Sequence, residues 1–260
     1  MFAQNMYGHF SRLATDYNEL RLTDLEPVLF IKEQLKSLPA IDAADIGCGA
    51  GRYDLLFFRH LKNLHLTFID INKSMLEETA LYLKSNGIIN FKLVQSGSDN
   101  IPLGDESMDV IFTFNAVHHF NFHQFLENAA RIIKQTGFTF IYTRLQRQNA
   151  TNIWGRYFPL FLKKEKRLYD LDEMKDMIQS VGSLTIDVVK DFRYRRCATL
   201  EQLLKRVKSR HYSTFSLYSE DELKESLREF EKKITHSYRD SGNIEWVDEN
   251  IMLVLRHRTN

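Results

Sequence analysis

The chain has 260 residues, which suffices for one sizeable hydrophobic core and a small appended region, so one domain with insertions is expected. Its 35 Lys and Arg residues balance 34 Asp and Glu residues, and the resulting net charge of +1 disfavours nucleic acid as a partner. No segment predicts a membrane span or a secretory signal, and we therefore expect a cytoplasmic protein.

The N-terminal residues predict two helices. In residues 10–21, apolar positions 10, 13, 14 and 17 share one face of a helix. A second apolar pattern predicts a helix over residues 23–38, which Pro39 ends. Both helices precede the first predicted strand.

A glycine-rich turn follows, in residues 43–52 (AADIGCGAGR), between an apolar strand and an apolar helix over residues 53–61. Glycine tolerates positive φ and has no Cβ, so such a turn can bring backbone amides against a ligand. A dinucleotide-binding turn reads G-x-G-x-x-G, whereas here Arg52 stands at the last of those positions and the glycines read G-x-G-x-G. This spacing favours a ligand without a pyrophosphate.

The next strand, residues 65–70, ends in Asp70, about 20 residues after the glycine turn. A carboxylate at this place can accept hydrogen bonds from both hydroxyls of a ribose. The turn and the carboxylate together predict a nucleoside-containing ligand.

The rest of the chain alternates predicted helices with predicted strands, which is typical of an α/β fold. The predicted helices cover residues 74–84, 125–134, 171–181, 200–207 and 219–239, the last opening with the capping pattern Ser219-x-x-Glu222. The predicted strands cover residues 91–95, 108–114, 137–142, 184–189 and 251–255. Two cysteines, Cys48 and Cys197, are too few for a disulfide framework, and we expect reduced thiols.

Residues 45–51 (DIGCGAG) and 70–76 (DINKSML) resemble motifs I and II of the class I S-adenosylmethionine (SAM) dependent methyltransferases. The likeness runs from about Phe10 to Thr143 and is greatest to the small-molecule branch that includes ubiquinone- and biotin-pathway enzymes. It implies a Rossmann-like, doubly wound sheet of seven mostly parallel strands with an antiparallel last strand, and helical lid insertions. It also implies one domain over residues 1–260, with a helical cap (1–38), a SAM-binding core (39–145), and lid or substrate insertions (146–170 and 191–240).

The resemblance implies a set of SAM contacts. These are Tyr17, Arg21, Asp45, Gly47, Cys48, Gly49, Gly51, Asp70, Ile71, Met75, Ser98, Asp99 and Asn115. Tyr17 and Arg21 match a family segment that caps the pocket, although a helix packed on the core with a solvated Arg21 is the alternative. Gly97 stands where the family usually has an adenine-contacting Asp, so the Ser98 amide or Asp99 would have to replace it. Asp99 can equally be a solvated loop carboxylate.

The end of the fourth strand, residues 115–119 (NAVHH), is expected beside the methionine end of SAM. It lacks the N-P-P-Y pattern of enzymes that methylate adenine or glutamine amino groups. His118 is a candidate general base because the pKa of histidine lies near working pH; a packed or capping histidine is the alternative. Adjacent histidines diverge, and no cysteine or carboxylate joins them at ligand spacing, so we expect no metal site.

Past Thr143 the family pattern fades. Residues 152–162 are aromatic and residues 163–167 are basic, in a region where this fold inserts substrate lids. The basic run is a solvated face, a contact for an acidic substrate or a lipid-facing surface. The candidate substrate contacts, each of which can also be plain core or surface, are His119, Trp154, Tyr157, Arg193, Arg195, His211 and Tyr212.

The resemblance implies SAM-dependent transfer of a methyl group to a nucleophile on a small-molecule acceptor. One alternative is a SAM-binding sensor or partner subunit without turnover. An RNA or protein methyltransferase is another, disfavoured by the near-neutral charge. A nicotinamide-dependent oxidoreductase is disfavoured by Arg52 in the glycine turn. The acceptor and the oligomeric state stay open.

Overall fold

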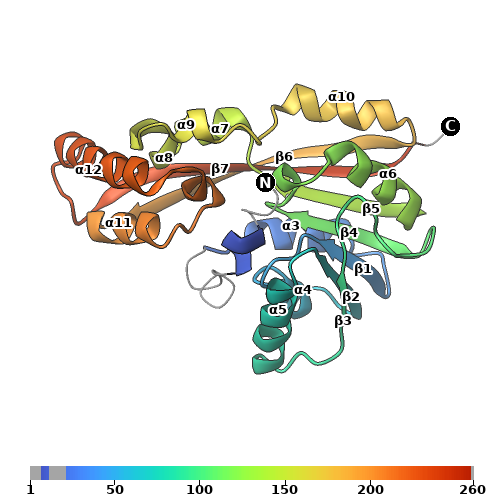
Figure 1. Ribbon diagram of the computed structural model, residues 1–260. Helices are drawn as coiled ribbons and strands as arrows, with labels where there is room; N and C mark the ends of the chain where they lie inside the picture. The colour runs from blue at the N-terminus through green and yellow to red at the C-terminus, as the bar shows by residue number, and fades with distance from the viewer. Residues whose placement is uncertain (1–6, 12–21, 259–260) are drawn as a thin grey trace. The chain divides into compact units, whose positions relative to one another are not determined.

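The structure is a computed structural model that describes residues 7–11 and 22–258 of the chain (Figure 1). Tyr17 and Arg21 lie outside the described residues, so their assignment to SAM stays a prediction. The chain divides into two compact units. The first, here the sheet unit, contains residues 10–11, 22–143, 171–192 and 251–258, and the second, here the accessory unit, contains residues 7–9, 144–170 and 193–250.

A seven-stranded sheet organises the chain, with the strand order β3-β2-β1-β4-β5-β7-β6 (Figure 1). The strands are β1 (Ile41–Ile46), β2 (Leu64–Asp70), β3 (Lys92–Gln95), β4 (Met108–Phe114), β5 (Ile133–Thr143), β6 (Leu184–Ala198) and β7 (Ile244–His257). Strands β1 to β5 pair in parallel, and β7 is antiparallel to β5. The predicted Rossmann-like sheet with an antiparallel last strand is confirmed.

The centre of the sheet is buried on both faces, as the apolar run in β4 predicts. Phe112 of β4 stacks on Phe57 with 4.3 Å between the ring centroids and lies 5.9 Å from Phe140 of β5. All three side chains are fully buried. Apolar burial of this kind is the main stabilising contribution to the fold.

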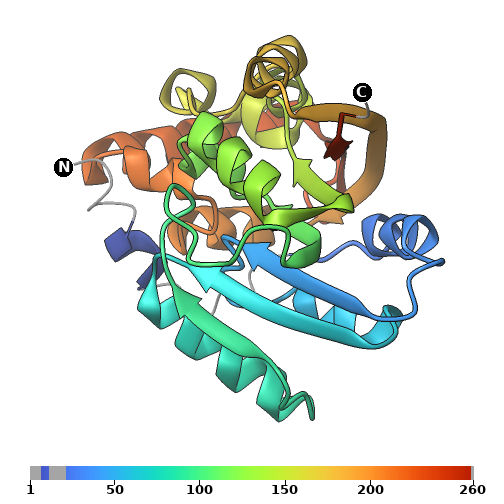
Figure 2. The ribbon, with the colours of Figure 1, turned by 90° about the vertical axis from the view of Figure 1, so that its right-hand side faces the viewer.

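The helices of the sheet unit are α3 (Glu26–Gln34), α4 (Asp54–His60), α5 (Lys73–Ser85), η2 (Val117–His119), α6 (Phe122–Ile132) and α10 (Leu171–Val181). Figures 1 and 2 show α6 and α10 on one face of the sheet and α5 on the other. The Asn72 side chain caps α5 by accepting a hydrogen bond from the Met75 amide, and Asn121 caps α6 in the same way. These caps fix where both helices begin.

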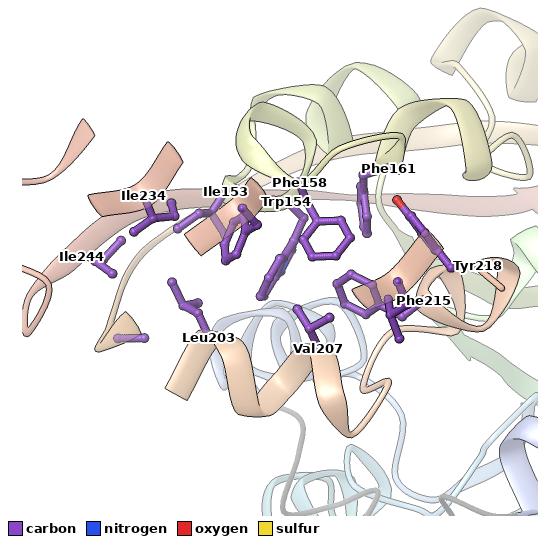
Figure 3. Close-up of a cluster of buried hydrophobic side chains, with 13 residues drawn as sticks. Ile153, Trp154, Phe158, Phe161, Leu203, Val207, Phe215, Tyr218, Ile234 and Ile244 are labelled. Atoms are coloured by element: carbon purple, nitrogen blue, oxygen red, sulfur yellow. The ribbon is translucent and has the colours of Figure 1, made fainter. Parts of the chain in front are cut away.

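The accessory unit contains α7 (Gln146–Thr151), α8 (Ile153–Tyr157), α9 (Phe161–Lys164), α11 (Leu200–Lys208), η3 (Ser213–Leu217) and α12 (Glu220–Ser237). Figure 3 shows side chains of α8, α9, α11, η3 and α12 gathered around Trp154 and Phe158. Segments 146–170 and 191–240, predicted as lid or substrate insertions, supply most of this unit, and that role stays a prediction. Every described helix is too short or too polar to cross the hydrocarbon of a bilayer.

Three strands are longer than predicted. β5 was expected over residues 137–142 and spans Ile133–Thr143, so the helix before it ends at Ile132 and not at residue 134. β6 was expected to end at residue 189 and continues to Ala198, so Arg193 and Arg195 lie on a strand instead of a loop. β7 was expected to begin at residue 251 and begins at Ile244. The Arg258 amide donates to the Ser183 carbonyl, and the Cys197 thiol donates to Asn243. These contacts join the start of one strand to the end of the other, so β6 and β7 are antiparallel.

Candidate functional site

The glycine turn follows β1 directly and is held by backbone contacts to β2. Gly47, Gly49 and Gly51 all have positive φ, at +73°, +59° and +76°. The Gly47 amide donates to the Ile69 carbonyl at 2.7 Å. A Cβ at position 47 would lie 2.6 Å from the Cβ of Ala116, so only glycine fits both the conformation and the space. The predicted tight turn is therefore present, and the approach of a ligand to its backbone amides stays a prediction.

Asp70 ties the end of β2 to the glycine turn. Its Oδ2 accepts a hydrogen bond from the Gly49 amide at 3.0 Å, and its Oδ1 accepts one from the Asn72 amide at 2.8 Å. Burial raises the pKa of Asp70, and the backbone donors at Asn72 and Gly49 act against that shift. Each carboxylate oxygen has a second lone pair, so the fixed side chain can still accept bonds from two hydroxyls.

Helix α5 supports the other side of the turn. The Thr79 hydroxyl donates to the Gly49 carbonyl at 2.6 Å, and a Cβ at Gly51 would lie 2.9 Å from the Thr79 methyl carbon. Met75 is buried and packs against Ala50 and Phe10, so it acts through packing. Thr79 was missed by the sequence analysis, because only the folded helix brings it to the turn.

A pair of buried carboxyl groups lies behind the turn. Asp45 at the end of β1 is 2% exposed, and Asp54 at the start of α4 is 1% exposed. Within the described residues, one oxygen of Asp45 and both oxygens of Asp54 have no hydrogen-bond partner. Burial and the neighbouring Asp54 raise the pKa of Asp45 well above its usual range, and burial raises the pKa of Asp54 to about 7. Asp54 was also missed, because an acidic residue at a helix start resembles an ordinary dipole contact.

The two cysteines are free thiols in different environments. Burial, together with the nearby Asp70, raises the pKa of Cys48 well above its usual range, so its thiol is protonated at neutral pH. Cys197 is exposed on β6. Among residues 7–11 and 22–258, no three His, Cys, Asp or Glu side chains are grouped as metal ligands would be.

The loop after β3 places Asp99 beside Gly97. A Cβ at position 97 would lie 2.4 Å from Oδ1 of Asp99 and 3.9 Å from Cδ1 of Ile71. The Asp99 carboxylate therefore lies where a side chain of residue 97 would begin. The loop is closed by the Ser96 hydroxyl, which donates to the Asn100 carbonyl at 2.7 Å, and Ser98 lies half-buried within it. Ile71, 62% exposed, offers an apolar surface next to this carboxylate.

Residues 115–119 form the turn after β4. Asn115 has a φ of +54°, and its amide donates to the Tyr142 carbonyl at 2.7 Å. The rings of His118 and His119 are 4.1 Å apart, and His119 meets Phe10 edge-on at 5.2 Å. Because Ala116 contacts Gly47, this turn lies directly beside the glycine turn. The predicted cofactor residues within the described chain thus lie at or near the carboxyl ends of β1, β2, β3 and β4, with Met75 on α5.

The remaining candidate substrate residues belong to the accessory unit. Trp154 is 2% exposed, and its ring stacks on Phe230 at 5.4 Å, which assigns it to core packing. His211 is buried too, and its ring lies 4.2 Å from that of Tyr212. Arg193 pairs with Glu249 at 2.8 Å. Tyr157 is half-buried against Tyr238, and Arg195 is exposed on β6.

The known proteins that this chain resembles in sequence are named methyltransferases. Residues 43–137 match the model of a methyltransferase domain. The chain is 31% identical over 94 residues to the methyltransferase YcgJ of Bacillus subtilis, a match that covers 36% of each protein. It is 27% identical over 111 residues to phthiotriol/phenolphthiotriol dimycocerosates methyltransferase of Mycobacterium tuberculosis, which covers 42% of this chain and 40% of that one. The matches thus span well under half the length of these curated relatives.

Solved structures show the same fold. The crystal structure of Bacillus subtilis YcgJ has a TM-score of 0.63 at 16% identity and covers 90% of this chain and 99% of that one. Geranyl diphosphate C-methyltransferase from Streptomyces coelicolor, solved with S-adenosyl-L-homocysteine, has a TM-score of 0.56 at 14% identity, with 90% of this chain and 76% of that one covered. At these identities the likeness concerns the fold.

Proposed function

We propose that the chain is a class I SAM-dependent methyltransferase, which transfers a methyl group from SAM to a nucleophilic atom of a small-molecule acceptor. The match of residues 43–137 to a methyltransferase domain supports this proposal. The observation that carries the proposal is the glycine turn. Its backbone is held by two hydrogen bonds to β2, one from the Gly49 amide to the Asp70 carboxylate and one from the Gly47 amide to the Ile69 carbonyl. The names of the relatives support a small acceptor, since two of them act on dimycocerosates and on geranyl diphosphate.

The residues of the site fit SAM. Asp70 is positioned to accept hydrogen bonds from the ribose hydroxyls, and Ile71 and Asp99 offer an apolar surface and a carboxylate for the adenine ring. Gly47 and Gly49, both with positive φ, are the proposed neighbours of the methionine moiety, together with Asn115. SAM supplies a methyl group that its sulfonium has already activated for attack. The chain therefore has to orient the acceptor and exclude water, and no catalytic triad is required.

His118 is the proposed general base, because it lies in the turn after β4 beside the glycine turn. Once an acceptor is known, His118→Ala should lower kcat by about 10²-fold or more while SAM affinity is kept. His123→Ala, at an exposed position of α6, is the matched control and should keep full turnover. A rate for His118→Ala near that of wild type would remove it as the base.

The accessory unit is proposed to supply acceptor contacts, chiefly through Tyr157, Arg195 and Tyr212. Residues 144–170 and 193–250 of this unit lie outside the matched domain. The match therefore does not identify the acceptor. We also place the protein in the cytoplasm, where two free thiols stay reduced.

Calorimetric titration with SAM, S-adenosylhomocysteine and NAD in parallel tests the proposal. Binding of SAM and its product, with no heat from NAD, is the expected result. Failure to bind SAM would overturn the proposed activity. SAM binding without turnover across a broad panel of acceptors would favour a sensor or partner subunit instead.

A further inference from the structure

The buried carboxyl pair behind the glycine turn is unusual in its surroundings. Asp45 and Asp54 come from different elements, β1 and α4, are 2% and 1% exposed, and interact with each other through their side chains. Neither forms an ion pair with a described Lys, Arg or His, and three of their four oxygens lack a hydrogen-bond partner within the described residues. A buried polar group without a partner costs folding free energy, so its retention calls for a reason.

Two such carboxyl groups cannot both be ionised at low cost. Removing a carboxylate from water is expensive, and a second negative charge at contact distance adds repulsion that no nearby cation offsets. A single proton held between the two groups lowers both the desolvation cost and the repulsion, because the neutral acid donates a hydrogen bond to its charged neighbour. Burial shifts the pKa of each group upward, consistent with this arrangement.

The other ionisable groups around the pair favour the protonated state as well. Asp70 at the end of β2 adds negative charge, and the Cys48 thiol is neutral. Tyr53, the residue before α4, is a neutral phenol, and burial raises its pKa further. The Arg52 guanidinium lies over the Tyr53 ring, 4.6 Å from its centroid, and donates to the Leu22 carbonyl. No described cation therefore neutralises the pair.

We propose that Asp45 and Asp54 hold one proton between them in the ligand-free protein, and that a positive charge bound at the adjacent glycine turn expels this proton to solvent. This inference rests on the proposed function, in which the α-ammonium group of SAM is that charge. No direct contact between ammonium and carboxylate is needed, because a cation a few ångströms away acts strongly through a buried, low-dielectric region. Binding of the cofactor is then coupled to release of a proton.

The test is calorimetry of SAM and S-adenosylhomocysteine at pH 7 in buffers of different ionisation enthalpy, which counts the protons exchanged on binding. Wild type should release up to about one proton with either ligand, and its Kd should fall by up to about tenfold per pH unit from pH 6 to 7. 5′-Methylthioadenosine keeps the nucleoside but lacks the ammonium group. It should bind without this proton release.

Asp54→Asn is the decisive variant, since asparagine has the same size as the neutral acid and can still donate to Asp45. It should bind SAM with little or no proton release and a flat pH dependence, and any protonation change of the ligand itself will appear equally in both proteins. Asp172→Asn, at an exposed position of α10, is the matched control and should behave as wild type.

Two results would overturn the inference. SAM binding by wild type without proton release, or equal release by wild type and Asp54→Asn, would show that the pair does not change its protonation, and the proposed methyltransferase activity would stand. Absence of SAM binding would instead defeat the proposed function, and this inference with it. The calorimetric traces distinguish these cases directly.

Discussion

Asp70 illustrates how one side chain serves both the fold and the proposed ligand. Its two oxygens accept hydrogen bonds from the amides of Gly49 and Asn72. Removing the carboxylate therefore also removes contacts that hold the glycine turn. We expect Asp70→Ala to weaken SAM binding by about 1.5–3 kcal/mol, the usual contribution of hydrogen bonds to a charged group. Calorimetry against Asp172→Ala, an exposed control, measures the difference. Unchanged affinity would contradict the assigned role.

The stability of the fold should carry a signature of Asp54. Folding raises its pKa to about 7, whereas the unfolded chain releases the same proton near pH ~3.9. The folded state therefore binds more protons between these values, and the contribution of Asp54 to stability is lost as pH rises from about 4 to about 7. Asp54→Asn escapes this loss, so its free energy of unfolding relative to wild type should increase over that range and level off above it. Urea unfolding of both proteins across the pH range measures this, and a pH-independent difference would count against the shift.

The sequence predicted the site residues whose role depends on the local backbone. It did not predict those whose role depends on contacts made only in the folded chain. The spacing of Gly47, Gly49 and Asp70 predicted a turn beside a carboxylate, and the structure joins them. Thr79 and Asp54 contribute only after α5 and α4 have packed, and nothing in their local sequence marks them.

Among the larger elements, the strand–turn–helix of β1 and α4 depends most on its glycines. Gly47 and Gly87 have nearly the same φ, +73° and +80°, but an added Cβ meets Ala116 at 2.6 Å at position 47 and open space at position 87. We expect Gly87→Ala to cost about 1–2 kcal/mol for the left-handed conformation alone. Gly47→Ala should cost about 1–3 kcal/mol more, because of overpacking, and should abolish SAM binding. Equal costs in chemical denaturation would show that crowding is unimportant.

Strand β6 shows where element prediction failed. Its second half contains Lys190-Asp191-Phe192-Arg193-Tyr194-Arg195, whereas the strand was expected to end at residue 189. The apolar residues alternate, and Phe192 and Tyr194 are buried while Arg193 and Arg195 point to solvent. The alternation of apolar and polar residues that is typical of a strand was therefore present. It was overlooked because the alternate positions are arginines, which a strand with one solvated face tolerates.

Both tryptophans of the chain, Trp154 and Trp246, lie in the accessory unit. Their fluorescence reports that unit, whereas circular dichroism reports both. Because β6 and β7 supply residues to both units, we expect one cooperative transition in urea. SAM at about 100 times its Kd should then stabilise the protein by about 2.7 kcal/mol by either probe. A fluorescence midpoint that ignores SAM while the dichroism midpoint shifts would show that the units unfold separately.

At this scale the sequence predicted the sheet far better than the accessory core. Trp154 was a candidate substrate contact with core packing as the alternative, because aromatic residues suit both pockets and interiors and composition does not distinguish them. Its burial depends on Phe215 and Phe230, which are distant in sequence and pack on it only in the folded chain. Buried parallel strands, in contrast, can be predicted from apolar runs of a few consecutive residues.

The contrast between the two thiols makes the native chain suitable for site-selective labelling. Cys48 is held neutral by burial beside carboxylates, whereas Cys197 is exposed on β6. A maleimide dye at neutral pH should therefore attach at Cys197 first, with no cysteine removed by mutagenesis. The dye would then sit in the accessory unit, which also holds both tryptophans as energy-transfer donors.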